Sequence, residues 1–551
     1  MRKTFIVAIL SIIAINFVFA SNLIACTNYL VSKGASTDGS VMITYNADAG
    51  GFMEPLYFSP ARDYKEGDSV AVYDWDSGKY LGKIKQVLHT YSVIGNINEY
   101  EVSLGETTFG GRSELRDTDG KIDYGSLMYL ALQRAKNARE AIQVMGDLVA
   151  EYGYYSSGES FSVADANEAW ILEMVGKGSK ERGALWAARR VPDGYVCAHA
   201  NQSRIREVPV NDPENCMFQK DIFEYSKKKG WYKPDSAAFS FVDCYCPLEP
   251  EGLLFCEGRV WRFFSRVAPS QNFSEDYWRA VKGAEPYPLF IKPDKKISPQ
   301  ELISMMRDHF EGTKYDMTKG AAAGPFACPI RWKGLLWKLP GDTVTEYAWE
   351  RPVSTQQTAF AFCSQLRSNM PREIGGVFWY GDDDNYSNVY MPLYCCMNKA
   401  PKSFTGGSLR ELDLNSAFWV FNLVANLAYS KYSIIIKDIQ KVQSELENKF
   451  FAYQPAIETA AMQLYEKDPK LAVDFLTDYS VNTAESTVSR WKDLWYELVP
   501  RYNDGYINDV SQANGRHPKS SGYGEEFLRN AVNERPEYYK VKWREKKPNN
   551  P

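Results

Sequence analysis

Histidine is scarce in this 551-residue chain: there are four, and none of them forms an HExxH pair. The ligand pattern of a zinc protease is therefore absent from the sequence. The chain also has no GxxxxGKS or GxxxxGKT stretch and no GxSxG stretch, which excludes a P-loop and the usual nucleophile elbow. Basic residues are not in excess, since there are 64 of them against 69 acidic residues, for a formal net charge of -5. A general nucleic-acid binder needs a basic surface, so no nucleic-acid partner is expected.

The composition is that of a folded globular protein, with 44% hydrophobic and 24% charged residues. Aromatic residues make up 14% of the chain, including 36 tyrosines and 14 tryptophans. That content can build a large core, or a binding surface for peptides or carbohydrates. The length allows about three domains of ordinary size, or one large enzyme domain with insertions.

The N-terminus has the pattern of an export signal. Two basic residues, Arg2 and Lys3, precede the apolar run Phe5–Phe19, and a small residue follows it. No later stretch reaches about 18 consecutive apolar residues, so no membrane span is expected. We therefore predict a signal peptide over residues 1–20 and a short propeptide, or the remainder of the export signal, over residues 21–25. The protein is then exported to the periplasm or the outside of a bacterium.

Ten cysteines are present, and export permits disulfide bonds. Only one residue separates Cys244 from Cys246. Because no companion pair accompanies them and histidines are few, we interpret them as disulfide partners of other cysteines rather than metal ligands. The spacing leaves the pairing open. Neither a metal nor an organic cofactor is expected.

The chain from Cys26 onward predicts a β-hairpin. Residues 26–33 and 40–46 both have strand-forming sequences, and the residues between them are turn formers such as Gly, Ser and Asp-Gly. Reflection through the middle of this turn pairs Cys26 with about Ala47. The return strand should therefore bring Asp48 and its neighbours beside Cys26.

Strand patterns come first in the chain, then helices, then strands again, and this order favours a layered α+β fold over regular βαβ repeats. Further strands are predicted at residues 86–94, 102–108, 160–164, 169–175 and 185–190. Helices are predicted at residues 137–151, with Asn137 as the N-cap, and at residues 299–310, and later at 417–451, 456–465, 469–477 and 485–498. The predicted organisation is a catalytic domain over residues 26–414, a helical C-terminal region over 415–541 packed onto it, and a polar tail over 542–551.

Cys26 has three interpretations. Residues 23–26, Leu-Ile-Ala-Cys, satisfy a lipobox, so the thiol could carry a lipid; it could form a disulfide; or it could become an N-terminal nucleophile. An N-terminal cysteine offers a thiol together with an α-amine of reference pKa about 7.7–8.0, which makes one residue both nucleophile and base. A lipoprotein normally begins with a flexible tether, whereas Cys26 leads directly into the strand signal of residues 27–31. This context favours the nucleophile.

The stretch Cys26-Thr-Asn-Tyr-Leu-Val-Ser-Lys-Gly-Ala-Ser-Thr-Asp-Gly-Ser resembles the start of the exported dipeptidases of the dipeptidase A type, which belong to the cysteine Ntn (N-terminal nucleophile) hydrolases. The similarity continues in order through residues 105–112, 158–165, 168–173, 186–194, 200–205, 260–265, 378–381 and 417–422. It implies an αββα four-layer sandwich with the catalytic cysteine at the start of a central strand. It also implies cleavage before Cys26 as the activating step, and a small peptide, most simply a dipeptide, as substrate.

The resemblance further implies catalytic roles for three residues besides the cysteine. Asp48 would hold the α-amine of Cys26, Asn201 would lie near the nucleophile, and Arg262 would organise the pocket. Each has a simpler alternative. Asp48 lies in a turn-rich stretch, Asn201 begins a glycosylation sequon in form, and Arg262, among aromatic neighbours, suits a structural ion pair or stacking.

Substrate and oxyanion contacts are expected from two short stretches. The counterpart of the oxyanion hole falls within Glu106, Thr107 and Thr108, where Glu106 could alternatively bind a substrate amine or neighbouring backbone. Tyr45 and Asn46 precede Asp48, and Tyr45 stands where many relatives have arginine. A phenol lacks the fixed positive charge that would lower the pKa of the thiol or bind a carboxylate.

Two other polar features are not assigned a role. The acidic run Asp382-Asp-Asp384 is more typical of a solvated turn than of a cation site. His199 should share a strand face with Asn201, but an N-terminal nucleophile does not require a histidine base. Two alternative functions stay open: a linear-amide acylase acting on N-acyl amino acids, bile-salt conjugates or penicillin V, and a lipid-anchored binding protein with Cys26 as the anchor. The sequence leaves the oligomeric state open.

Overall fold

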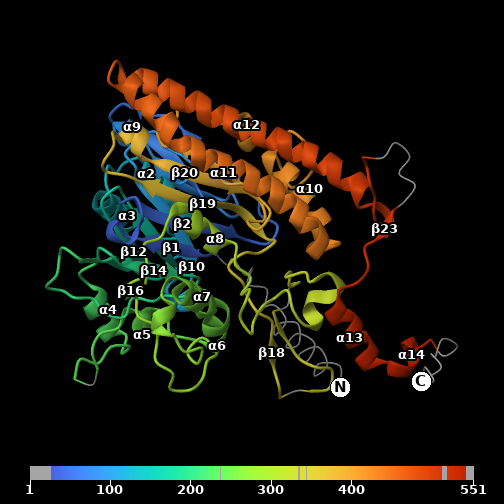
Figure 1. Cartoon of the computed structure of the whole chain (residues 1–551). Helices are drawn as coiled ribbons and strands as arrows, with labels where there is room; N and C mark the ends of the chain where they lie inside the picture. The colour runs from blue at the N-terminus through green and yellow to red at the C-terminus, as the bar shows by residue number, and fades with distance from the viewer. Residues whose placement is uncertain (1–25, 236, 333–334, 343, 512–517, 542–551) are drawn as a thin grey trace, which may run out of the picture.

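The computed structural model describes residues 26–235, 237–332, 335–342, 344–511 and 518–541. The predicted signal peptide, propeptide and polar tail lie outside these described residues. Two large antiparallel sheets pack face to face in the described chain, with helices on their outer faces (Figure 1). Four further sheets of the described residues have two strands each. The predicted α+β class is confirmed.

Cys26 immediately precedes a strand in the middle of the first sheet. In the described residues this sheet has seven strands in the order β16-β14-β1-β2-β19-β20-β21. Their bounds are Asn28–Val31 (β1), Val41–Asp48 (β2), Val196–His199 (β14), Phe290–Ile291 (β16), Thr358–Leu366 (β19), Val377–Asp382 (β20) and Met391–Tyr394 (β21). All pairings are antiparallel.

The second sheet packs against the first through β10, β11 and β12, which lie near β1 and β2. Its strand order in the described residues is β15-β13-β12-β11-β10-β9-β8-β3. The bounds are Phe58–Ser59 (β3), Val93–Ile94 (β8), Ile97–Asn98 (β9), Ser103–Thr108 (β10), Gly158–Ala164 (β11), Ala169–Gly176 (β12), Ala184–Arg190 (β13) and Cys216–Phe218 (β15). Strands β11 and β12 are buried along their whole length.

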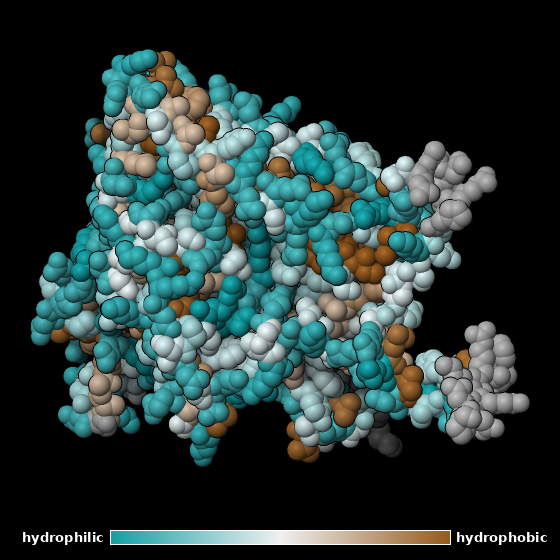
Figure 2. Space-filling model, viewed as in Figure 1, coloured by the Kyte–Doolittle hydropathy of each residue, from teal (hydrophilic) through white to brown (hydrophobic). Residues whose placement is uncertain are grey.

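Helices cover the outer faces of both sheets. Helices α2 (Tyr124–Leu132) and α3 (Ala138–Tyr152) pack on the second sheet, while α10 (Ala417–Tyr429), α11 (Tyr432–Tyr465) and α12 (Pro469–Arg501) pack on the first. In Figure 1 the last three, in orange, lie along the strands of that sheet. The face of the molecule in this view is largely hydrophilic with smaller hydrophobic areas (Figure 2). Amphipathic helices produce such a surface, because their apolar sides pack on the sheet. Two further helices, α7 (Gly258–Val267) and α8 (Pro299–Met306), lie near β14 and β2.

The predicted hairpin register is confirmed. Leu30 pairs with Ile43 and Val31 with Met42, and an isolated bridge joins Thr27 to Asn46. Continuing this register by one residue places Cys26 opposite Ala47. The N-terminal end of β1 therefore lies beside the C-terminal end of β2.

Helix α3 begins as predicted, because the Asn137 side chain accepts a 2.9 Å hydrogen bond from the backbone N–H of Glu140. Helix α8 is shorter than the predicted 299–310. It ends at Met306, and the left-handed backbone of Phe310, with φ of 63°, cannot belong to a continuing helix.

The C-terminal helices have other bounds than predicted. The single helix predicted over 417–451 is wrong, because Lys431, with φ of -148°, separates α10 from α11. Helix α11 continues through Pro455, although a proline inside a helix costs about 3 kcal/mol. The two segments predicted between residues 469 and 498 form the single helix α12. Packing of these helices against each other and β21 offsets the local cost. Because this region shares its core with the first sheet, the predicted boundary at residue 415 stays a prediction.

All ten cysteines lie in the described residues as free thiols. The predicted disulfides of Cys244 and Cys246 are therefore wrong: both side chains are buried where α5 (Phe241–Tyr245) ends, without a sulfur partner. Within the described ranges no helix has the length and apolar character to cross a membrane. The same residues contain no cluster of three or more His, Cys, Asp or Glu side chains suited to a metal ion.

Candidate active site

Cys26 opens into a cleft between the ends of the two sheets and helix α2. The cysteine is 2% exposed, because strands and helix surround it on several sides. The first sheet contributes Tyr45, Ala47, Asp48 and Phe360 to the cleft, β10 contributes Glu106, α2 contributes Tyr124, Met128 and Tyr129, and loops contribute Ala49, Phe52, Trp75, Asp76 and Asn96. The hairpin register thus places one thiol at the wall of a mixed polar and aromatic cleft.

The thiol of Cys26 is surrounded by oxygen atoms. Its Sγ lies 3.5 Å from Oε1 of Glu106 and 3.6 Å from the hydroxyl of Tyr45, and that hydroxyl donates to the same Glu106 oxygen. Burial and the negative charges of Glu106 and Asp48 raise the pKa of the Cys26 thiol well above its ordinary value, while the backbone N–H of Asp48 lowers it. The thiol is therefore protonated at neutral pH and needs a base to become a nucleophile.

Asp48 is a buried strand residue and not part of a turn. It ends β2, is 1% exposed, and accepts hydrogen bonds from Nη2 of Arg351 at 3.0 Å and from Oγ1 of Thr358 at 2.6 Å. Burial raises the pKa of Asp48 to about 6, although Arg351 opposes this shift. The carboxyl therefore titrates closer to neutrality than an ordinary aspartate.

A buried arginine that the sequence did not indicate holds the backbone of Cys26. Nη1 of Arg259, on α7, donates to the carbonyl of Cys26 at 2.5 Å and to Oγ1 of Thr27 at 2.8 Å. Its Nη2 donates to the carbonyl of Ala200 at 3.1 Å and to Oδ1 of Asn201 at 2.9 Å. Burial lowers the pKa of Arg259 to about 10, so it stays charged at neutral pH. One guanidinium thus fixes the entry to β1 and the exit from β14.

Asn201 connects this arginine to the second sheet. Its Nδ2 donates to the carbonyl of Thr108 at 2.8 Å while its Oδ1 accepts from Arg259. The backbone of Asn201 is left-handed, with φ of 61°, a conformation that asparagine tolerates better than most residues. The structure therefore brings Asn201 to the Cys26 neighbourhood through Arg259 and Thr108.

The other predicted residues make contacts away from the thiol. Arg262 donates to Oδ1 of Asp308 at 2.7 Å and to the carbonyl of Glu311 at 2.7 Å. Asn46 donates to the carbonyls of Met306 and Val353, and Thr107 contacts Nδ1 of His199 at 2.7 Å. Arg259 and Arg262 are less than one helical turn apart, so the sequence pattern alone could not decide which of them meets Cys26.

His199 is not a base for this thiol. Its two ring nitrogens lie 2.7 Å from the hydroxyl of Thr107 and 2.8 Å from that of Ser162, and the ring is fully buried. Burial lowers the pKa of His199 to about 3. The neutral ring joins β14 to the second sheet through these two hydroxyls.

Glu106 belongs to a pair of buried carboxyls. Strands β10 and β11 pair Thr108 with Glu159, which places Glu106 and Glu159 diagonally on one sheet face. Burial raises the pKa of both groups, and their mutual contact favours one shared proton. With the Asn28 amide turned so that its oxygen faces the second sheet, it accepts from the N–H of Glu106 at 3.1 Å and donates to that residue's carbonyl at 3.1 Å. Through Asn28, strand β1, which follows Cys26, holds the backbone of Glu106.

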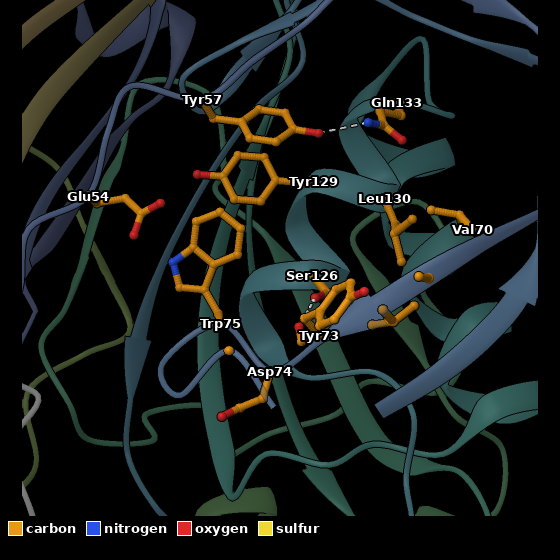
Figure 3. Close-up of a pocket in the computed structure, with 13 residues that line it drawn as sticks. Glu54, Tyr57, Val70, Tyr73, Asp74, Trp75, Ser126, Tyr129, Leu130 and Gln133 are labelled. Carbon is orange, nitrogen blue, oxygen red and sulfur yellow. Dashed lines mark hydrogen bonds between the residues drawn. The ribbon is translucent and has the colours of Figure 1, made fainter. Parts of the chain in front are cut away.

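A larger pocket adjoins the cleft and shares Trp75 and Tyr129 with it. Its volume is about 420 Å³. Figure 3 shows the rings of Tyr57, Tyr129 and Trp75 stacked in one column, with centroids 4.1 Å apart for the first pair and 4.6 Å for the second. Glu54 lies on one side of this column, and apolar side chains lie on the other. The pocket can accept a side chain of a ligand bound at Cys26.

Comparison with known proteins gives the family of the chain. The model of peptidase family C69 matches residues 25–445, which include both sheets and begin one residue before the buried thiol. A probable dipeptidase of Latilactobacillus sakei is 25% identical over 501 residues, which are 86% of this chain and 95% of that protein. Dipeptidase A of Lactobacillus helveticus is 24% identical over 446 residues, 77% of this chain and 84% of that protein. The chain is therefore a peptidase, a hydrolase of peptide bonds, and belongs to peptidase family C69.

Proposed function

We propose that this protein is an exported cysteine dipeptidase whose nucleophile, Cys26, becomes the N-terminal residue when residues 1–25 are removed. The observation that carries the proposal is the thiol itself, buried at the start of a central strand, open to a cleft, and held from behind by Arg259. The names of the similar dipeptidases support the substrate class. The layer order of helices, two sheets and helices is that of an αββα Ntn-hydrolase sandwich, which we propose as the fold.

The chemistry follows from an N-terminal cysteine. The freed α-amine of Cys26 accepts the thiol proton, directly or through water, and the thiolate attacks the carbonyl carbon of the peptide bond. Donors within Glu106–Thr108 and at Asn201 stabilise the oxyanion. The C–N bond then breaks, the leaving amine takes the proton, and water hydrolyses the thioester to regenerate the thiol. Asp48 orients the ammonium form of the amine, and the pocket beside Trp75 receives a substrate side chain.

The two alternative functions differ from this proposal in what must occupy the cleft. A linear-amide acylase would use the same nucleophile. Its acyl chain would lie in the aromatic pocket, which is large enough to hold one. The carboxyls of Asp48, Asp76 and Glu106 on the cleft wall suit an apolar acyl group poorly. A lipid anchor on Cys26 would need an exposed sulfur, and this one is 2% exposed.

Maturation provides a direct test. While residue 25 remains attached, the amine of Cys26 is tied up in a peptide bond and cannot act as a base. We expect the processed chain to have the intact mass of residues 26–551 with an unmodified cysteine, and to release free amino acids from dipeptides. An uncleaved chain, blocked by substitutions within residues 21–25, should be inactive.

Both the processed and the uncleaved chain are assayed with the same substrates, which are dipeptides, penicillin V and N-acyl amino acids. A fully active uncleaved chain would contradict the role of the amine. Preferential hydrolysis of the acylated compounds would favour the acylase, and a diacylglyceryl mass on Cys26 would favour the lipid anchor.

The proposed role of Asp48 predicts a pH effect. Since the pKa of Asp48 is about 6, its carboxyl loses the negative charge below that pH and can no longer hold an ammonium group. We expect kcat/KM to fall on the acid side as the amine becomes protonated and can no longer accept the thiol proton. Asp48→Asn lacks the charge at every pH, so its kcat should be lower by about 10- to 100-fold with a smaller change in KM, and the acid limb of its kcat/KM profile should move to lower pH, because the carboxylate no longer favours the ammonium form.

Asp38→Asn is the control for this pH profile. Asp38 lies at the turn end of the same hairpin, where it accepts from Ser40 and from Gln365. Its substitution should leave the profile unchanged. An Asp48→Asn enzyme with the rate and pH profile of the wild type would return Asp48 to a purely structural role.

A further inference from the structure

Negative charge on the wall of the Cys26 cleft has no cation beside it. The residues that line the cleft include Asp48, Asp76 and Glu106. Within the described part of the chain, no lysine or arginine lines it. Asp48 is paired with Arg351, which lies behind the wall. Of the other two carboxyls, Glu106 is buried and Asp76 is exposed, so the charge of Glu106 is the one that remains to be balanced.

Neutral groups provide the hydrogen bonds to these two carboxyls. Oδ1 of Asp76 accepts from the hydroxyl of Tyr124 at 2.7 Å, and Oε1 of Glu106 accepts from Tyr45. Glu106 also contacts the carboxyl of Glu159 behind it, and the proton that this pair shares joins the two groups. Burial raises the pKa of Glu106, as expected of a carboxylate without a cation. The pKa of Asp76 is raised in the same direction, although the residue is exposed. A cation that enters the cleft would offset this cost.

Bond geometry identifies the cation that fits. In a peptide with a free amino terminus, one Cα separates the ammonium nitrogen from the first carbonyl carbon, so the two atoms are about 2.5 Å apart. A thiolate ready to attack lies about 3–3.5 Å from that carbon. The ammonium nitrogen then lies within about 6 Å of the sulfur, close enough to bond a carboxylate oxygen adjacent to the thiol. Oε1 of Glu106 is 3.5 Å from Sγ of Cys26.

We propose that the carboxylates of Glu106 and Asp76 bind the free α-ammonium group of the substrate, so that the enzyme cleaves the peptide bond one residue from an unblocked amino terminus. This inference rests on the proposed function, in which Cys26 attacks that bond. Glu159 keeps the shared proton of the carboxyl pair, which leaves Glu106 anionic towards the cleft. The bound ammonium also balances the negative charge that opposes ionisation of the Cys26 thiol.

The amine of processed Cys26 does not replace the substrate in this role. It is a single cation, and its place beside Asp48 follows from the hairpin register. It must also lose its proton to act as a base, and then carries no charge. Asp76 belongs to the turn between β5 (Ser69–Tyr73) and β6 (Tyr80–Lys85) and lines the same cleft.

The experiment compares leucyl-alanine with 4-methylpentanoyl-alanine, which differs only in lacking the amino group. We expect the wild-type enzyme to prefer the dipeptide by at least about 100-fold in kcat/KM. Asp76→Asn should lower kcat/KM for the dipeptide by about 10- to 100-fold, mainly through KM, and should leave the rate on the desamino compound unchanged. The selectivity ratio therefore falls.

Asp68→Asn is the matched control. It removes the same charge just before β5, where Asp68 accepts from the backbone N–H of Lys65 at 2.8 Å and lines neither the cleft nor the adjoining pocket. Its selectivity should equal that of the wild type. Equal rates of the wild-type enzyme on the two compounds, or a selectivity that Asp76→Asn does not lower, would overturn the proposal while leaving dipeptide hydrolysis in place.

A binding measurement separates this proposal from the catalytic one. L-leucinol contains no peptide bond, and 4-methylpentan-1-ol is its counterpart without the amine. Calorimetric titration of the processed protein should show binding of leucinol at least about 10-fold tighter than of the alcohol, with the difference lost in Asp76→Asn and in Glu106→Gln. This result would support the ammonium site even if no dipeptide were hydrolysed. Equal affinity for the two alcohols would overturn it.

Discussion

Peptide hydrolysis is expected to disappear when Cys26 is replaced by alanine, with a loss of about four orders of magnitude or more in kcat. Alanine has no nucleophilic atom, while the α-amine at residue 26 and the cleft remain. Cys26→Ser keeps a hydroxyl, which ionises far less readily than a thiol, so it should retain at most a small residual rate. Both variants are measured as processed chains beginning at residue 26, because the uncleaved chain is expected to be inactive.

Cys197→Ala is the control for this loss. Cys197 is also fully buried, in the neighbouring strand β14, where it pairs with Leu30 of β1. Its substitution removes a thiol from the same sheet without touching the cleft, and should reduce stability slightly while kcat remains near the wild-type value. Wild-type turnover by folded Cys26→Ala, with circular dichroism and melting unchanged, would end the assignment of the nucleophile.

The environment of this thiol explains why maturation matters for the proposed mechanism. The sequence shows Tyr45 where a positive charge would lower the pKa of a neighbouring cysteine, and the structure places its neutral hydroxyl 3.6 Å from the sulfur. Burial and Glu106 raise the pKa of the thiol instead. In the proposed mechanism, the thiol is therefore deprotonated by a base, and a nearby cation stabilises the thiolate. The freed α-amine and the substrate ammonium would supply them.

Local patterns predicted the parts of the site that depend on one hairpin. The register from Cys26 to Asp48 follows from strand alternation and turn residues, and it is correct to the residue. The class of the fold follows from the order of strands and helices. Arg351, Glu159 and Asp76 reach the site from elements that are far away in the chain, so no local spacing connects them with Cys26. Tertiary packing also overrides local signals, as at Pro455 within α11.

The contrast between Arg259 and Arg262 shows the same limit within one helix. Both arginines lie on α7, three residues apart, and each suits either a pocket or a structural ion pair. The resemblance to dipeptidases indicated Arg262. The direction of the helix relative to β1 decides the matter, and it turns Arg259 towards the carbonyl of Cys26 and Arg262 towards Asp308.

Replacing Arg259 should therefore reduce turnover in a way that replacing Arg262 does not. Arg259→Met removes the donors to five acceptors, among them the carbonyls of Cys26 and Ala200. We expect a loss of about 2–5 kcal/mol in the free energy of unfolding. In the chain that remains folded, the start of β1 is no longer fixed, so kcat should fall by about 100-fold or more while KM changes less. Arg259→Lys keeps a charge and some donors and should recover part of kcat.

Arg262→Met serves as the matched variant, measured at a temperature where both proteins are folded by circular dichroism. It breaks the 2.7 Å contact with Asp308, which retains Arg266 at 3.0 Å, so it should lower the melting temperature and leave kcat near the wild-type value. A merely structural role for Arg259 predicts that the two variants lose stability without a selective loss of kcat and without recovery by lysine. Equal losses of kcat in both variants would show that the whole of α7, rather than the contact of Arg259 with Cys26, supports catalysis.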